Sequence, residues 1–164
     1  MNRQGDDLTS ARWIAREAVQ ADAELLWRWA NDPGVRENSF SPDSIAFDSH
    51  SRWLAGKLSS ADSTTYIIER DGKPIGQVRY DRTNDDEAEI DVSIAADERS
   101  RGYGRQALDL TKAHALLDLR VEHVIGLVLA TNEYSGAMFL KAGFVEQERR
   151  TVAGRSCRVF EWRA

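Results

Sequence analysis

The sequence predicts an α+β fold with a mixed, mostly antiparallel sheet of about seven strands, flanked by about four helices. Asp71-Gly72 separates two runs of strand-forming residues, which is the pattern of a β-hairpin. Residues 88–130 read as strand, helix and strand, which predicts a parallel crossover. The chain of 164 residues, 41% of them hydrophobic, suits a single core. We therefore expect one domain over 9–164 after a loose polar segment at 1–8.

The first third of that domain is predicted to be mainly helical. Residues 11–18 resemble a short opening strand, and apolar residues at helical spacing predict a helix over 22–31. The run Asn-Asp-Pro-Gly at 31–34 is expected to end this helix. A loop and a second helix over 49–58 follow.

The remaining segments are predicted to form most of the sheet. Strands at 64–69 and 74–80 flank the hairpin turn, and the next strand, 88–94, alternates between apolar and polar residues. Its polar face carries Glu89, Asp91 and Ser93. The later elements are expected to be a helix at 102–119, a doubly buried strand at 124–130, a helix at 132–142, and a closing strand pair at 144–149 and 155–162.

Composition excludes several classes of function. The chain has 22 Lys and Arg against 27 Asp and Glu, so its net charge of -5 argues against a nucleic-acid partner. No apolar run approaches the roughly 20 residues of a membrane span, so we expect no membrane partner and a cytoplasmic location. No metal is predicted, because no His, Cys and Asp cluster has ligand spacing. The oligomeric state is left open between monomer and homodimer.

The segment 99–105 carries the strongest chemical signal. It lies between a predicted strand and a predicted helix, whose first N–H groups bind anions when the backbone can approach them. Two glycines allow that approach, and three arginines add positive charge. The alternative is a turn whose arginines face water. The predicted phosphate contacts are Arg99, Ser100, Arg101, Gly102, Tyr103, Gly104 and Arg105.

Two other phosphate motifs do not match this segment. A Walker loop needs Gly-Lys followed by Ser or Thr, but Gly104 precedes Arg105-Gln106. A dinucleotide fingerprint needs a third glycine where this chain has Ala107.

The pattern Arg99-x-x-Gly102-x-Gly104 resembles the acetyl-CoA loop of the GNAT superfamily of N-acetyltransferases. A second motif, Asn132-x-x-Ser135-x-x-x-Phe139-x-x-x-Gly143-Phe144, is similar to the later helix of that family, which flanks the pantetheine arm. The order of strands and helices also matches over nearly the whole chain. The resemblance implies a GNAT-like fold, acetyl-CoA as the cofactor and a small-molecule amine as the acceptor.

The resemblance also implies roles for residues around the thioester. The main chain from Val92 to Ile94 would pair with pantetheine, and the strands 88–94 and 124–130 would splay to leave a cleft. Asn132 and Ser135 would line this cleft. Many members have a tyrosine that protonates the departing thiolate where this chain has Phe139, so Tyr134, Ser135 or water would have to act instead.

Two carboxylates are candidates for the catalytic base. Glu89 is the first choice, because it lies on the polar face of its strand in an Ala-Glu-Ile segment that resembles ribosomal-type acetyltransferases. Asp91 is the second choice. Each is equally well interpreted as a solvated carboxylate at a strand edge.

The segment from Trp27 to Phe40, followed by His50-x-x-Trp53, resembles acetyltransferases of pseudaminic-type sugar synthesis. These act on a nucleotide-linked amino sugar, whose rings could stack on aromatic planes and whose phosphate could bind Arg36. Alternative acceptors are a protein N-terminus and an antibiotic amine, and a different class is a non-catalytic acetyl-CoA-binding module. The predicted substrate residues are Trp29, Asn31, Arg36, Ser39, His50 and Trp53.

Overall fold

The computed structural model describes residues 10–164, so the predicted loose segment 1–8 lies outside the described residues. The strands are β1 (Trp13–Glu17), β2 (Ser63–Arg70), β3 (Lys73–Arg82), β4 (Glu87–Ile94), β5 (His123–Leu129), β6 (Val145–Val152) and β7 (Arg155–Arg163). The α-helices are α1 (Ala23–Ala30), α2 (Pro33–Glu37), α3 (Phe47–Leu58), α4 (Tyr103–Leu119) and α5 (Glu133–Lys141). Two short 3-10 turns, Gln20–Asp22 and Ala96–Glu98, complete the described elements.

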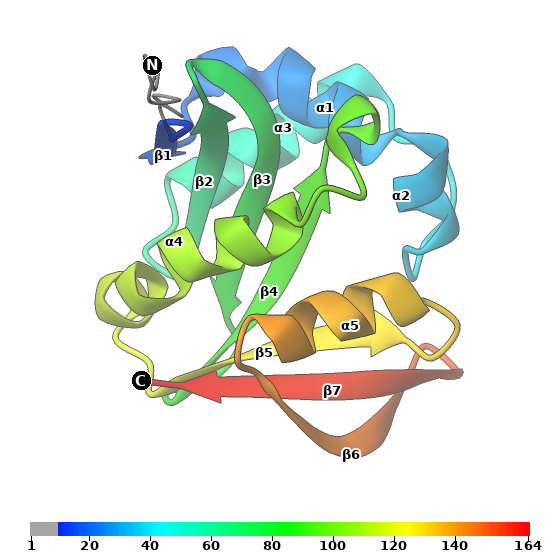
Figure 1. The fold of residues 1–164 in the computed structure, drawn as a ribbon. Helices are drawn as coiled ribbons and strands as arrows, with labels where there is room; N and C mark the ends of the chain where they lie inside the picture. Colours follow the sequence, from blue (N-terminus) through cyan, green and yellow to red (C-terminus); the bar gives the residue numbers. More distant parts are fainter. Residues whose placement is uncertain (1–9) are drawn as a thin grey trace, which may run out of the picture.

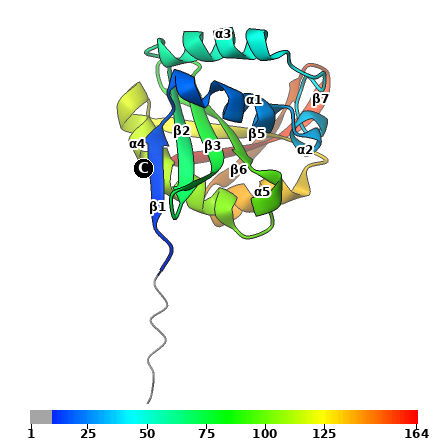
Figure 2. The same ribbon diagram turned by 90° about the horizontal axis from the view of Figure 1, so that it is seen from above.

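All seven strands form one sheet in the order β1-β2-β3-β4-β5-β7-β6. Helices α4 and α5 cover one face, while α1 and α3 cover the opposite face (Figures 1 and 2). The only parallel pair in this sheet is β4 with β5, and α4 connects these two strands. The predicted fold class and the predicted crossover are therefore confirmed.

The sheet opens along the junction of β4 and β5. Pairing between them runs only from Glu87 opposite His123 to Ile90 opposite Gly126. Beyond Ile90 the edge of β4 that faces β5 has no strand partner within the described chain. Figure 1 shows the two halves of the sheet diverging from this point, with α5 beside the opening.

The hairpin between β2 and β3 forms where the sequence predicts it. Asp71 and Gly72 both have positive φ angles, 51° and 80°, which suit a two-residue turn that follows the twist of the strands.

Helix α2 is the main departure from the predicted elements. The run at 31–34 ends α1 as expected, but it also begins a new helix. The Asp32 carboxylate accepts hydrogen bonds from the N–H groups of Gly34 at 3.0 Å and Val35 at 3.4 Å. Pro33 occupies the first helical position, where its fixed φ and missing N–H cost nothing. The same four residues therefore stop one helix and start the next.

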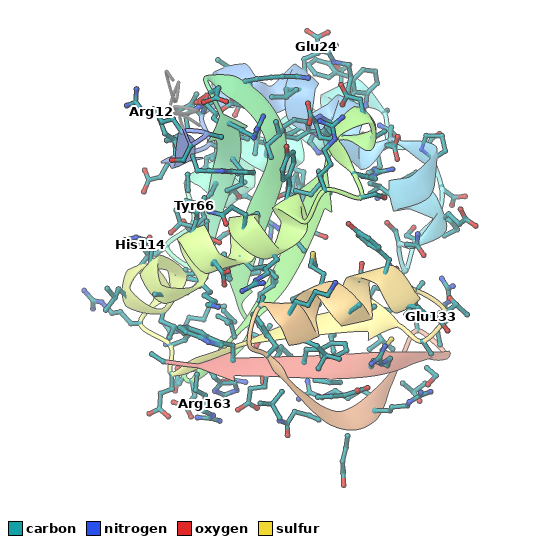
Figure 3. The ribbon with its side chains drawn as sticks, viewed as in Figure 1. Arg12, Glu24, Tyr66, His114, Glu133 and Arg163 are labelled. Carbon is teal, nitrogen blue, oxygen red and sulfur yellow. The ribbon has the colours of Figure 1, made fainter. Side chains whose placement is uncertain are left out.

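The larger core lies between the sheet and the helices α4 and α5, and a smaller one lies between the sheet and α1 and α3. Two tyrosine hydroxyls fix α4 to the sheet. Tyr66, labelled in Figure 3, donates to Asp118 at 2.6 Å. The Tyr80 hydroxyl is 2.7 Å from Thr111 Oγ1. His114 lies on the exposed side of α4. Among residues 10–164, no helix combines the length and the apolar character that crossing a bilayer requires.

Candidate active site

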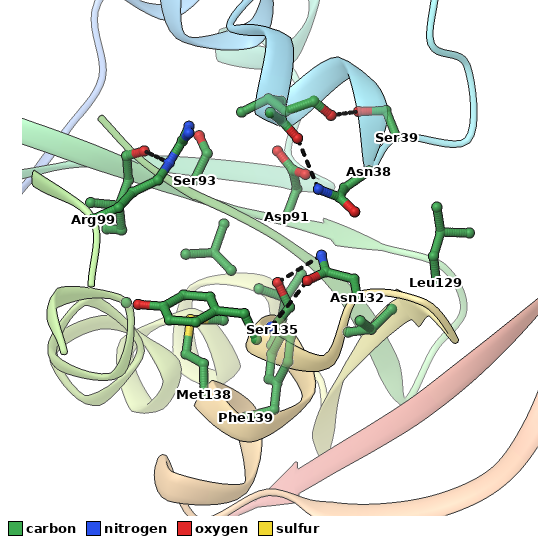
Figure 4. A pocket seen from close by; sticks show the side chains of 18 of the residues that line it. Asn38, Ser39, Asp91, Ser93, Arg99, Leu129, Asn132, Ser135, Met138 and Phe139 are labelled. Carbon is green, nitrogen blue, oxygen red and sulfur yellow. Dashed lines mark hydrogen bonds between the residues drawn. The ribbon is translucent and has the colours of Figure 1, made fainter. Parts of the chain in front are cut away.

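A cleft of about 300 Å³ occupies the opening between β4 and β5. It is bounded by β4, the loop before α4, the start of α5, and α2 (Figure 4). Nine of the twelve predicted cofactor residues line it, whereas Arg101, Gly102 and Arg105 do not. The nine are Val92, Ile94, Arg99, Ser100, Tyr103, Gly104, Asn132, Ser135 and Phe139.

The loop between β4 and α4 presents backbone N–H groups at the edge of this cleft. Ser100 and Gly102 have left-handed φ angles of 64° and 78°, so the chain turns sharply before α4 begins at Tyr103. No side chain of the described residues caps the start of α4. Its first N–H groups are therefore available to an anion.

The three arginines of the loop have different surroundings. Arg99 is directed inward: its Nε donates to the Ile94 carbonyl at 3.0 Å and its Nη2 to Asp32 Oδ1 at 2.8 Å. Burial alone would raise the pKa of Asp32, but the hydrogen bond and charge of Arg99 outweigh burial and lower it. Arg101 and Arg105 are exposed and make only weak pairs, so they are the loop cations that a phosphate can recruit.

Gly104 is required for a reason that the sequence did not indicate. A Cβ at this position would lie 2.3 Å from Met138 Sδ, which belongs to α5. The absent side chain therefore permits α4 and α5 to pack closely, in addition to leaving the loop backbone open.

Asn132 and Ser135 lie across the cleft from Asp91 and Asn38 (Figure 4). Asn132 caps α5 by accepting from the Ser135 N–H at 3.2 Å, and its amide donates to the Ser135 hydroxyl at 3.0 Å. The cap thus fixes both polar side chains at the wall of the cleft.

Phe139 is a core residue at the floor of the cleft and is only 3% exposed. Its ring stacks on Phe160 with centroids 5.5 Å apart. A Cβ on Gly126 would lie 2.4 Å from Phe139 Cζ, so the ring tip rests directly on the backbone of β5.

We expect Phe139→Tyr to give no gain in kcat and to lower the free energy of unfolding by about 1–3 kcal/mol. The added hydroxyl would meet the β5 backbone rather than the thioester. Urea unfolding and steady-state kinetics would measure the two effects. A tenfold increase in kcat would contradict this geometry.

A second pocket of about 390 Å³ lies on the other face of the sheet, below α1, α2 and α3. Four of the six predicted substrate residues line it, namely Arg36, Ser39, His50 and Trp53. Asn31 does not line it: this side chain bonds the N–H of Ile45 at 2.7 Å and its carbonyl at 3.0 Å, and so holds the following loop. Trp29 also lies elsewhere, packed against the smaller core.

An arginine packs against an aromatic ring in this second pocket. The Arg79 guanidinium lies 4.7 Å from the centre of the Trp53 ring, and its Nε donates to Asp81 at 2.7 Å. Burial, followed by the charges of Arg79 and Arg36, lowers the pKa of His50. Both effects favour the neutral form of this histidine.

Arg36 differs from its predicted role as a phosphate ligand. Its Nε donates to the Ala30 carbonyl at 2.6 Å and its Nη1 to the Ser41 carbonyl at 2.9 Å. Its guanidinium therefore ties the loop after α2 to the end of α1.

The two predicted bases occupy different positions. Asp91 lines both pockets and accepts from Gln77 Nε2 at 2.9 Å. Within the described chain, Glu89 lines neither. Burial, followed by the charge of Asp81, raises the pKa of Glu89. Of the two predicted bases, Asp91 is therefore the one that lies beside both pockets.

The contribution of β3 to the second pocket was not predicted from the sequence. Gln77 and Arg79 alternate with buried apolar residues and share a face with the polar side chains of β4. Polar residues at every second position of an otherwise buried strand are the signal that would have found them.

No group of three or more His, Cys, Asp or Glu within residues 10–164 is arranged to hold a metal ion.

The uncapped start of α4 lies beside the cleft on one side of a split sheet, and a polar pocket lies on the other side, which is an arrangement suited to two substrates. Residues 12–145 match the family model of the acetyltransferase (GNAT) domain, so the chain belongs to the GNAT acetyltransferase family. Its class is that of an acetyl-CoA-dependent N-acetyltransferase, as the two motifs predicted. No curated protein matches the sequence.

Solved acetyltransferase structures share the fold at low sequence identity. AAC(6')-Ib in complex with paromomycin and acetyl-CoA has a TM-score of 0.80 and 18% identity, covering 92% of this chain and 93% of the other. A spermidine N-acetyltransferase from Vibrio cholerae with CoA and spermine has a TM-score of 0.81 and 16% identity, covering 92% of this chain and 95% of the other. The ribosomal L7/L12 α-N-protein acetyltransferase RimL with coenzyme A has a TM-score of 0.81 and 12% identity, covering 94% of this chain and 95% of the other.

Proposed function

We propose that the chain transfers the acetyl group of acetyl-CoA to a primary amine of a nucleotide-linked amino sugar. The observation that carries the reaction is a shared wall: Asp91 and Ser93 line both the cleft and the second pocket. A thioester in the cleft and an amine in the second pocket would meet at these residues, which is the proximity that acetyl transfer requires.

The cleft supports binding of coenzyme A along its whole length. The pyrophosphate would rest on the N–H groups at the start of α4, and the pantetheine would pair with the free edge of β4 beyond Ile90. Asn132 and Ser135 would face the pantetheine from the other side.

The chemistry needs a proton acceptor at the amine and a proton donor at the sulfur. The amine nitrogen forms the new bond to the thioester carbon as the carbon–sulfur bond breaks and the thiolate leaves. Asp91 is placed to take the proton of the attacking amine, directly or through water. Ser135 and Tyr134 also line the cleft and carry the hydroxyl that Phe139 lacks.

The charges of the second pocket support an acceptor that is not polycationic. Arg36 and Arg79 line it together with a single carboxylate, Asp91. Polyamines and aminoglycosides carry several positive charges, and this lining offers them one carboxylate, which already lies 3.5 Å from Arg79 Nη1. The face of Trp53 beside Arg79 suits a sugar ring linked to a phosphate.

Thiol release from acetyl-CoA tests the proposal. Wild-type protein would be assayed with a UDP-4-amino sugar, an aminoglycoside, spermidine and a peptide with a free N-terminus. We expect the highest kcat/KM with the amino sugar. A higher value for any other amine would overturn the acceptor assignment. Binding of acetyl-CoA without release on any amine would favour the non-catalytic module.

Trp53 provides a separate test of the pocket. Trp53→Ala is expected to raise the acceptor KM by about two- to twelvefold, because stacking on an aromatic ring contributes roughly 0.5–1.5 kcal/mol. Leu58→Ala is the control, since Leu58 is also exposed on α3 but does not line the pocket. Equal KM values for the two variants would place the acceptor elsewhere.

A further inference from the structure

One ion pair joins the cofactor loop to the helix that covers both pockets. Arg99 belongs to the loop and Asp32 to the start of α2, and the two are 67 residues apart in sequence. Arg99 Nη2 lies 2.8 Å from Asp32 Oδ1, while Arg99 Nε holds the Ile94 carbonyl at the end of β4. A single side chain therefore connects β4, the loop and α2.

The Asp32 oxygen that binds Arg99 also caps α2. Oδ1 accepts from the N–H groups of Gly34 and Val35, so the position of this carboxylate fixes the first turn of the helix. Both side chains are largely shielded, with 33% and 22% of their surfaces exposed, so salt screens the pair less than an open surface pair. Any shift of Arg99 must move the cap or break the pair.

Helix α2 in turn forms part of both substrate sites. Val35 and Ser39, on and just after α2, line the cleft and the second pocket alike. Arg99 packs closely against this helix, since a Cβ on Gly34 would lie 3.0 Å from Arg99 Nη1. The position of α2 therefore depends on the same arginine that shapes the loop.

We propose that Asp32 is a positioning residue that couples the two sites: Arg99 fixes the loop where coenzyme A would bind and, through Asp32, holds α2 over the acceptor pocket. This inference rests on the coenzyme A site of the proposed function. Linkage requires the coupling to be reciprocal, so a fixed α2 also favours binding at the loop.

Hydrogen exchange measured by mass spectrometry tests the coupling with coenzyme A as the only ligand. In the wild type we expect saturating coenzyme A to slow exchange of the amides of residues 34–39 by about fivefold or more. In Asp32→Asn the slowing should be lost, and exchange without coenzyme A should be faster than in the wild type, because the Arg99–Asp32 pair is present without the ligand. Asparagine caps a helix as well as aspartate but carries no charge for Arg99.

Glu37→Gln is the matched control, because it also removes one negative charge from α2 but lies exposed outside both pockets. It should retain the wild-type slowing. Equal slowing in Asp32→Asn and the wild type would overturn the inference, because direct contact with the ligand would then explain the effect. Calorimetry separates the two proposals: a wild type that does not bind coenzyme A refutes the cofactor site, whereas binding without slowing refutes only the coupling.

Discussion

Asp91→Asn is expected to lower kcat by about 100-fold or more, because a positioned general base typically contributes that much to rate. Asp91 is the predicted base that lines both pockets. Asparagine keeps the shape of the side chain and a hydrogen-bond acceptor for Gln77, so the loss should fall on kcat more than on either KM. Steady-state kinetics from pH 6 to pH 9 would measure it.

Glu89→Gln is the matched control for this experiment. It removes the same charge from the same polar face of β4, two residues away, but outside both pockets. We expect its kcat to remain within about twofold of wild type. A large loss in Glu89→Gln with a small loss in Asp91→Asn would restore our original ranking of the two bases.

The raised pKa of Glu89 gives this control a second readout. Between its ordinary value of 4.5 and its raised value, the folded state binds more protons than the unfolded state. The stability from protonated Glu89 is therefore lost as the pH rises through that window. Glutamine mimics the protonated form, so Glu89→Gln should not lower the free energy of unfolding at pH 7.

The features predicted correctly from sequence depend on short-range patterns. The positive φ angles at Asp71 and Gly72 follow from the turn they form, and the alternation over 88–94 follows from the pleat of one strand. The predicted start of the helix at 132 likewise depends on neighbours, since Asn132 Oδ1 accepts from the Ser135 N–H within one turn. Such signals are complete within a few residues, so no tertiary information is needed.

The features that were missed depend on partners far away in the chain. The pair of Arg99 with Asp32 was not predicted, because Asp32 lies 67 residues earlier and no sequence pattern connects the two. Arg79 was missed because its role depends on Trp53, which lies on α3 across the pocket. Helix α2 was missed because a stop signal and a start signal share the same residues. Long-range packing thus decides which polar residues reach a site.

Gly104→Ala is expected to lower the free energy of unfolding by about 1–3 kcal/mol and to weaken coenzyme A binding. Helix propensity alone predicts the opposite sign, since Ala in a helix interior is favoured over Gly by roughly 0.5–1 kcal/mol. The new Cβ would lie 2.3 Å from Met138 Sδ, so the Met138 side chain between α4 and α5 would have to move. Urea unfolding and calorimetric titration would record both losses.

Two further variants decide between this contact with Met138 and direct crowding of the pyrophosphate by the added methyl group. Gly56→Ala in α3 should gain stability, because nothing lies within 4 Å of the Cβ it would add. Adding Gly104→Ala to Met138→Ala should cost little, because the second change removes the sulfur that the first would strike, giving a coupling of about 1–3 kcal/mol. If stability recovers in the double variant but coenzyme A affinity does not, the methyl group itself must crowd the phosphate. If both recover, Gly104 serves the cofactor by letting α5 approach α4, and the loop glycine acts through packing.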